Sequence, residues 1–230
     1  MDDLAALRTD VARANRILEA SGLSNAFGHA SARIPRSDTF VLPQRRSPGF
    51  ADAATLITLD FDGKVVAGEG TPNSEFWIHA RIYAARPEIG AVVHAHPEAC
   101  VCLTQIGEPH RVVHNQGGPF YGRVSEYAEV GLIRSRVLGD RLAASLGGNV
   151  AAMMRGLGIT TVGSVVLTAT VAALFLEESA SLQLRMLAAA GGNASKIRAF
   201  TEEEAHRLDD QLGDGIVSRA WEYYAALADG

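Results

Sequence analysis

Two histidines close an apolar run in the segment Gly90-Ala-Val-Val-His-Ala-His-Pro97. The run predicts a short buried strand that the proline ends. Side chains alternate between the two faces of a strand, so His94 and His96 point to the same side, as in sites where His-x-His binds one metal ion. The pair therefore predicts a site for a divalent metal, Zn²⁺ or one of Mn²⁺, Co²⁺ and Fe²⁺.

A carboxylate precedes the histidine pair in the segment Thr71-Pro-Asn-Ser-Glu-Phe-Trp-Ile-His79. The segment predicts a helix start, with Asn73 or Ser74 as the N-cap and Glu75 in the first turn. His79 follows one turn later on the same face, and we expect it to support a ligand or to pack rather than to bind the metal. Glu75 is a candidate metal ligand and proton-transfer group. A metal with a carboxylate nearby can polarise a carbonyl while a base moves a proton.

The elements that must position these residues alternate between helical and strand patterns. We predict helices over 3–21, 74–85, 97–105, 129–146 and 164–190, and strands over 28–34, 39–42, 56–66, 90–96, 111–114, 150–155 and 159–162. Asp62-Gly63 predicts a hairpin turn, and Thr201-Glu-Glu-Glu204 a capping box. This order favours a three-layer α/β/α fold with a central mixed, mostly antiparallel sheet. We expect one domain over residues 1–230, with a helical extension from about residue 194.

The composition is that of an ordinary globular protein, with 230 residues, 47% hydrophobic residues and a formal net charge of −5. No run of Lys or Arg indicates binding to nucleic acid or to a membrane surface. The N-terminus carries acids where a secretory signal carries bases, so we expect a cytoplasmic protein. Cys100 and Cys102 are too close in sequence to pair well, which fits a reducing compartment.

The ordered set of motifs resembles the class II aldolase/adducin family over about residues 5–190. The residues that carry the likeness are Gly28-His-Ala-Ser-Ala-Arg33, Asp60-Phe-Asp-Gly63, Ser74-Glu75, His79, Arg86-Pro87, Ala91-Val-Val-His-Ala-His96, Gly163 and the helix that reaches Glu177. The resemblance implies an α/β/α fold, a divalent metal held by three histidines, and a cyclic homotetramer with active sites between subunits. It also implies that Glu75 is the acid/base and that His94 and His96 are metal ligands.

The third histidine of the family pattern is absent. Met154-Arg-Gly-Leu-Gly158 places Leu157 where that histidine is expected, and leucine cannot bind a metal. Three interpretations stay open: a site of two histidines completed by Glu75 and water, a replacement ligand from His114 or His29, or a site that has lost its metal.

The residues at the substrate end also differ from those of sugar-phosphate aldolases. Gly28-His29 and Asn73-Ser74 replace the usual Gly-Asn and paired serines, and Arg45 and Arg46 add two guanidiniums where small residues are usual. Because arginine matches planar carboxylates with two hydrogen bonds, these changes favour a small carboxylate substrate. The Gly-His-x-Ser loop, which ends at Ser31, is similar to loops in decarboxylating family members.

We therefore predict a metal-dependent carbon–carbon lyase that decarboxylates a small hydroxy, keto or aromatic acid. His29 would assist Glu75 in moving the proton. The alternatives are an aldolase of an unphosphorylated or phosphorylated substrate, a non-catalytic member without metal, and an iron-dependent oxygenase on the same fold.

Further candidates lie in the loop after residue 110. Tyr121 is a candidate proton donor, with a core or interface role as the alternative, and His114 is a candidate ligand, proton shuttle or ordinary polar residue. We expect His110 and His206 to face solvent.

Overall fold

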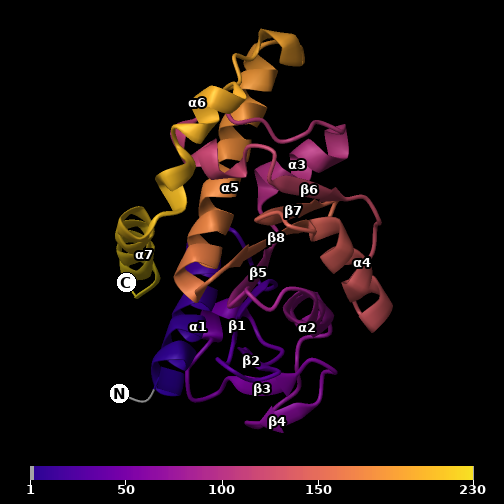
Figure 1. Cartoon of the computed structure of the whole chain (residues 1–230), viewed down its shortest axis with the longest axis vertical. Helices are drawn as coiled ribbons and strands as arrows, with labels where there is room; N and C mark the ends of the chain where they lie inside the picture. Colours follow the sequence, from indigo (N-terminus) through magenta and orange to yellow (C-terminus); the bar gives the residue numbers. More distant parts are fainter. Residues whose placement is uncertain (1–2, 230) are drawn as a thin grey trace.

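The computed structural model describes residues 3–229, which form a mixed sheet between two layers of helices (Figure 1). The helices are α1 (Asp3–Ala20), α2 (Phe76–Ala85), α3 (Glu98–Ile106), α4 (Arg136–Leu146), α5 (Val166–Ala189), α6 (Glu202–His206) and α7 (Asp214–Asp229). The strands are β1 (His29–Arg33), β2 (Thr39–Leu42), β3 (Ile57–Asp60), β4 (Val65–Ala67), β5 (Ala91–Ala95), β6 (Val124–Tyr127), β7 (Ala151–Met154) and β8 (Gly158–Gly163).

The described strands lie in the order β4-β3-β2-β1-β5-β8-β7-β6. Only β6 and β7 pair in parallel, and the other neighbours are antiparallel. This confirms the predicted mixed, mostly antiparallel sheet. The order also places β1 directly beside β5, with His29 opposite His94 and Ser31 opposite Val92.

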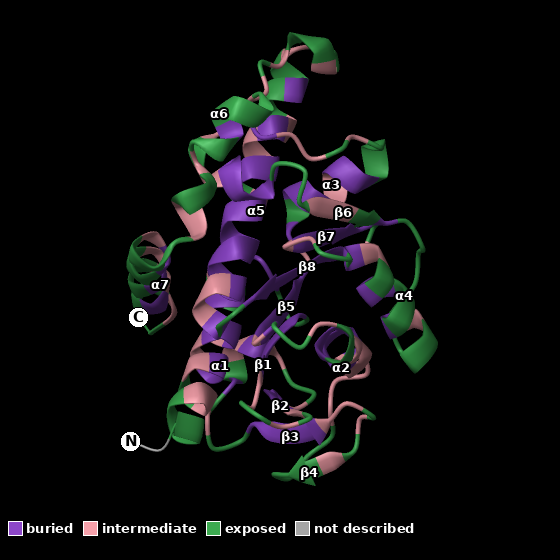
Figure 2. Cartoon of the chain, in the orientation of Figure 1, coloured by how far each residue is buried: buried purple, intermediate pink, exposed green. Residues whose placement is uncertain are grey.

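Alternation along the strands divides the core between the two faces of the sheet. Ala30 and Ala32 of β1 pack with α1, α3 and α5 on one face, whereas Val92 of β5 packs with α2 and α4 on the other. Figure 2 shows the inner strands of the sheet and much of α5 as buried, whereas the edge strands β4 and β6 are more exposed. His29, Ser31 and His94 belong to the α2 face, because each alternates with an alanine of the opposite face.

Several predicted boundaries are wrong. Residues 111–114 form no strand, because Arg111 N–H donates to the Gln183 side chain and the Val112 carbonyl accepts from Phe200 N–H, both outside the sheet. The edge strand β6 was not predicted. Helix α4 begins at Arg136 rather than near residue 129, because Ser135 caps it.

The N-cap of helix α2 lies one residue after the predicted cap Ser74 and two residues after the alternative, Asn73. Glu75 itself occupies the N-cap position, and Asn73 Oδ1 accepts from Glu75 N–H at 2.9 Å in the turn before it. The carboxylate nevertheless lies at the N-terminal end of the helix, as the sequence predicted.

Other local predictions are confirmed. Thr201 and Glu204 form a capping box, and both cysteines are free thiols. No helix within residues 3–229 is long and apolar enough to cross a membrane.

Candidate active site

One cleft of about 780 Å³ collects most of the predicted site residues. They come from loops, from the start of β1, from the residue after β5 and from the start of α2. The predicted residues that line it are Gly28, His29, Arg45, Arg46, Asn73, Ser74, Glu75, His96 and Leu157. Asn25, Ala26, Phe27, Ser47, Leu132, Arg134 and Gly156 complete the lining.

The floor of the cleft depends on the close pairing of β1 with β5. Gly28 precedes β1 with φ +109°, and a Cβ there would lie 2.2 Å from Ser24 Oγ and 3.2 Å from the His94 carbonyl oxygen. Asn15 of α1 hydrogen-bonds both the N–H and the carbonyl of Ala30. Glycine and this buried amide together fix the start of β1, and therefore the position of His29.

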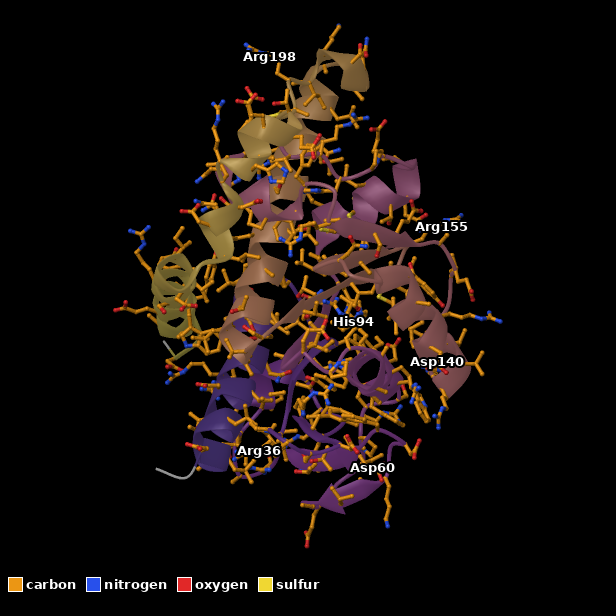
Figure 3. All side chains as sticks on the ribbon, in the orientation of Figure 1. Arg36, Asp60, His94, Asp140, Arg155 and Arg198 are labelled. Carbon is orange, nitrogen blue, oxygen red and sulfur yellow. The ribbon has the colours of Figure 1, made fainter. Side chains whose placement is uncertain are left out.

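His94 lies near the centre of the molecule, between the sheet and α2 (Figure 3). Its side chain is fully buried, and its Nδ1 donates to the Ile159 carbonyl oxygen at 2.9 Å. That bond leaves Nε2 with its lone pair, and Nε2 is buried without a hydrogen-bond partner among the described residues. A histidine fixed by a backbone carbonyl with its other nitrogen free is in the form that binds a metal.

His29, His79, Ser31 and Tyr83 form a buried hydrogen-bonded chain below the cleft. His29 Nδ1 lies 2.5 Å from His79 Nε2, His79 Nδ1 lies 2.6 Å from Ser31 Oγ, and Ser31 Oγ lies 2.8 Å from the Tyr83 hydroxyl. His29 and Ser31 alternate along β1, and Glu75, His79 and Tyr83 recur every four residues along α2. The chain thus follows the contact between one strand and one helix. His79 hydrogen-bonds His29 and does not line the cleft, and its predicted role of supporting a metal ligand stays a prediction.

Burial keeps these imidazoles neutral. Desolvation lowers the pKa of His79 to about 3 and is the largest cause of the lowered pKa values of His29, His94 and His96. Neighbouring histidines lower the pKa values of His29 and His94 further. Neutral imidazole is the form that donates a lone pair to a metal.

Glu75 is held at the rim by a loop that was not part of the predicted site. Its Oε1 accepts from Ile133 N–H at 2.9 Å, and burial raises the pKa of the carboxyl more than that bond and Arg134 lower it. The carboxyl therefore keeps its proton to a higher pH than an exposed glutamate. A carboxyl with a raised pKa beside a cleft is suited to proton transfer.

Three arginines and two apolar side chains surround the opening. Arg45, Arg46 and Arg134 are exposed there, and Phe27 and Leu132 are 72% and 43% exposed. Arg45 N–H donates to the Thr71 carbonyl, which joins the arginine loop to the segment that leads to Glu75. The opening therefore suits an anion with an apolar body.

Four predicted residues do not line the cleft, and the fully buried His94 is one of them. Ser31 is fully buried below it, so it cannot contact a substrate. Tyr121 lies outside the cleft at the start of a turn. His114 is also outside, with its Nε2 3.7 Å from Glu178 Oε1. His110 does not face solvent fully, because its Nε2 hydrogen-bonds Ser179 Oγ at 3.0 Å, whereas His206 is exposed as predicted.

The sequence interpretation missed Arg134, Phe27 and Tyr83. Phe27 directly precedes the predicted Gly28-His29 loop, and Tyr83 continues the spacing of Glu75 and His79, so both could have been found. Nothing in the local sequence pointed to Arg134, because only the fold brings its loop to Glu75.

The donor set fits a divalent metal in part. His94 presents a buried, unpartnered Nε2, and His96 lies just after the end of β5, with the two ring centroids 4.8 Å apart. Among residues 3–229, however, no three His, Cys, Asp or Glu side chains are arranged to hold a metal ion together. Two imidazoles are therefore available, and the role of Glu75 as a ligand stays a prediction.

The chain is similar to known proteins in sequence and in fold. The chain is 33% identical to a 3,4-dihydroxyphthalate decarboxylase from a Terrabacter species, over 96% of this chain and 97% of that protein. It is 30% identical to a 4-hydroxy-3-prenylphenylpyruvate oxygenase/4-hydroxy-3-prenylbenzoate synthase from Streptomyces roseochromogenus, over 76% of this chain and 61% of that protein. The fold matches an aldolase II superfamily protein from Pseudomonas syringae with a TM-score of 0.87 and 24% identity, over 100% and 94% of the two chains.

The profile of the class II aldolase and adducin N-terminal domain matches residues 9–184, which include all the predicted site residues. The chain belongs to the class II aldolase/adducin family.

Proposed function

We propose that this protein is a metal-dependent decarboxylase of a hydroxylated aromatic carboxylic acid. The observation that carries the proposal is the shared cleft, in which three guanidiniums face the same space as Glu75 and His29. The name of the Terrabacter relative, which covers nearly the whole chain, supports the same reaction class.

Each group of residues in the cleft has its own proposed role. Arg45, Arg46 and Arg134 would bind the carboxylate groups, and Phe27 and Leu132 would contact the ring. Asn73 and Ser74 would hydrogen-bond the ring hydroxyls. The metal is also proposed: His94 and His96 would hold a divalent cation, which when bound stabilises negative charge that develops on substrate oxygens.

The bond that breaks joins the ring carbon to the carboxyl carbon. Carbon dioxide leaves, the electron pair stays with the ring carbon, and one proton replaces the lost group. Glu75 is the proposed donor of that proton because burial raises its pKa, and His29 lines the cleft beside it. No oxidant is consumed, so the reaction balances without oxygen.

The test is an anaerobic assay of the purified protein with 3,4-dihydroxyphthalate and related hydroxybenzoates, after addition of Zn²⁺, Mn²⁺, Co²⁺ or Fe²⁺. We expect release of carbon dioxide and a product shorter by one carboxyl group, both lost in Glu75→Gln. Cleavage of a ketose phosphate without release of carbon dioxide from any aromatic acid would favour an aldolase instead.

An oxygenase is the second candidate, because the Streptomyces relative carries that name. Two histidines with a nearby carboxylate also resemble the ligand set of non-haem iron oxygenases. Turnover that requires both Fe²⁺ and oxygen would select this function over decarboxylation.

We also propose a homo-oligomer, a tetramer by family resemblance. Leu132, which lines the cleft, is exposed, and so are Val130 and Val137 nearby in the sequence, which agrees with a contact between subunits. Light scattering on the purified protein measures the subunit number directly.

A further inference from the structure

The buried chain below the cleft connects four groups, and each of them carries one hydrogen for hydrogen bonding when neutral. These groups are Tyr83, Ser31, His79 and His29. A neutral imidazole carries its hydrogen on one ring nitrogen only. The direction of the hydrogen bonds therefore decides which nitrogen of His29 is protonated.

The direction can be worked out from Tyr83, the inner end of the chain. Burial raises the pKa of the Tyr83 hydroxyl more than the hydrogen bonds of Ser31 and the Val92 backbone and the charge of Arg33 lower it, so the phenol keeps its hydrogen. A backbone contact of Val92 that lowers this pKa donates to the phenol oxygen, so it does not accept the phenol hydrogen. Ser31 Oγ, 2.8 Å away, is the side-chain acceptor for the Tyr83 hydrogen among the described residues.

The next two bonds are assigned in the same way, by finding an acceptor for each hydrogen. Ser31 is fully buried and its remaining side-chain partner is His79 Nδ1, so the serine hydrogen goes to that nitrogen. Any other direction leaves a buried hydroxyl hydrogen without an acceptor, at a cost of about 1 to 3 kcal/mol. His79 then carries its own hydrogen on Nε2 and donates it to His29 Nδ1.

We infer that Ser31, His79 and Tyr83 are positioning residues that hold His29 as the Nε2–H tautomer, so that His29 presents a hydrogen-bond donor to the cleft and is not the third metal ligand. Opposite it, the Ile159 carbonyl fixes His94 as the other tautomer, with the Nε2 lone pair free. Two neighbouring imidazoles thus have complementary roles. The catalytic consequence, donation by His29 to the substrate, rests on the proposed function, whereas the tautomer itself does not.

The experiment is NMR of the protein labelled with ¹⁵N-histidine, without metal, because the ¹⁵N–¹H correlations of each ring show which nitrogen carries the hydrogen. The His29 signals are identified by their loss in His29→Asn. We expect His29 and His79 protonated at Nε2, and His94 protonated at Nδ1. Protonation of His29 at Nδ1 in the wild type overturns the inference.

Two variants test whether the chain sets this tautomer. Ser31→Ala and Tyr83→Phe should give mixed or reversed tautomers at His29, and Ser31→Thr, which keeps the hydroxyl, should restore the wild-type form. Thr170→Val is the matched control, because it removes a buried hydroxyl that bonds only within α5. An unchanged His29 tautomer in both Ser31→Ala and Tyr83→Phe contradicts the inference. Loss of folding in either variant is recognised by its amide spectrum. In that case the tautomer measured in the wild-type protein decides whether the inference holds.

Kinetics separates this inference from the proposed function. If decarboxylation is found, Ser31→Ala should lower kcat by roughly tenfold or more with little change in KM, and Ser31→Thr should recover it. An unchanged kcat in Ser31→Ala would contradict the positioning role, whatever the substrate. If no aromatic acid is decarboxylated, the proposed function fails, while the NMR result still decides the tautomer.

Discussion

His29 and His94 lie opposite each other on β1 and β5, with ring centroids 5.3 Å apart, but their Nδ1 atoms have different hydrogen-bond partners. His94 Nδ1 contacts the Ile159 carbonyl, and His29 Nδ1 contacts His79. The two facing imidazoles therefore have different hydrogen-bond partners. Leu157, which the sequence predicts at the place of the family's third histidine, lines the same cleft and packs partly against the core on the α2 side.

Metal binding should depend on His94 and His96. Either alanine variant should abolish stoichiometric binding of Zn²⁺, Mn²⁺, Co²⁺ or Fe²⁺, measured by calorimetry and elemental analysis, because each removes one of the available imidazoles. His29→Asn should retain binding, and His206→Ala serves as an exposed control. Wild-type protein that binds none of these metals would show that the ligand pair is vestigial.

Restoring the missing imidazole should strengthen the metal site. Leu157→His should tighten metal binding by at least roughly tenfold, about 1.4 kcal/mol, because a third ligand would complete the family's site. Leu157→Met is the control for changes in packing, and competition with a coloured chelator gives the affinity. Equal affinity in Leu157→His and wild type would mean that another group already fills the third position.

Carboxylate binding should depend on the arginines of the opening. A guanidinium–carboxylate bond contributes about 1.5 to 3 kcal/mol to binding. Replacing an arginine that contacts the aromatic acid should therefore weaken its binding by roughly ten- to a hundredfold. The variants are Arg45→Ala, Arg46→Ala and Arg134→Ala. Lysine should rescue only in part, because it lacks the second donor. Calorimetry with Arg136→Ala as control, whose side chain pairs with Asp62, checks this. Tight binding of a ketose phosphate that none of the three changes disturbs would reject a carboxylate substrate.

The buried histidines should make the fold sensitive to acid. The pKa of His79 falls from 6.5 to about 3 on folding, so between these values the unfolded chain binds a proton that the folded chain does not. Stability should therefore fall as the pH drops from 6.5 towards 3, by up to about 1.4 kcal/mol per pH unit for this group. Urea titrations at several pH values measure the slope.

His79→Gln should reduce that slope, although it also lowers stability at neutral pH by disturbing the chain. His206→Ala is the matched control, because the pKa of this exposed histidine is raised by Asp209. Equal slopes for wild type and His79→Gln between pH 5 and 6.5 would show that His79 does not take up a proton on unfolding.

The charged form of Glu75 should lower the stability of the folded protein. Burial raises its folded pKa above the usual 4.5, so the stability it contributes is present below pH 4.5 and is lost as the pH rises through the folded pKa. Glu75→Gln, which stays neutral, should therefore be at least as stable as wild type at pH 8, measured by urea unfolding. A large loss of stability in this variant at pH 8 would mean that the charged carboxylate stabilises the fold.

The sequence by itself determined the parts of the site that depend on local periodicity. Alternation over residues 90–96 predicted that His94 and His96 share one face, although β5 itself ends at Ala95. The four-residue spacing predicted that Glu75 and His79 share one face of the helix over residues 74–85. The order of elements and the family motifs also predicted the fold, a mixed and mostly antiparallel sheet between helices.

Only the tertiary structure decided which of these elements meet. The β1–β5 pairing brings His29 opposite His94, and the packing of α2 on β1 joins His79 and Tyr83 to Ser31. The loop before α4 carries Ile133 and Arg134 to Glu75, whereas Tyr121 and His114 end outside the cleft. Local sequence cannot fix such contacts, because they join residues far apart in the chain and depend on how the whole hydrophobic core is buried.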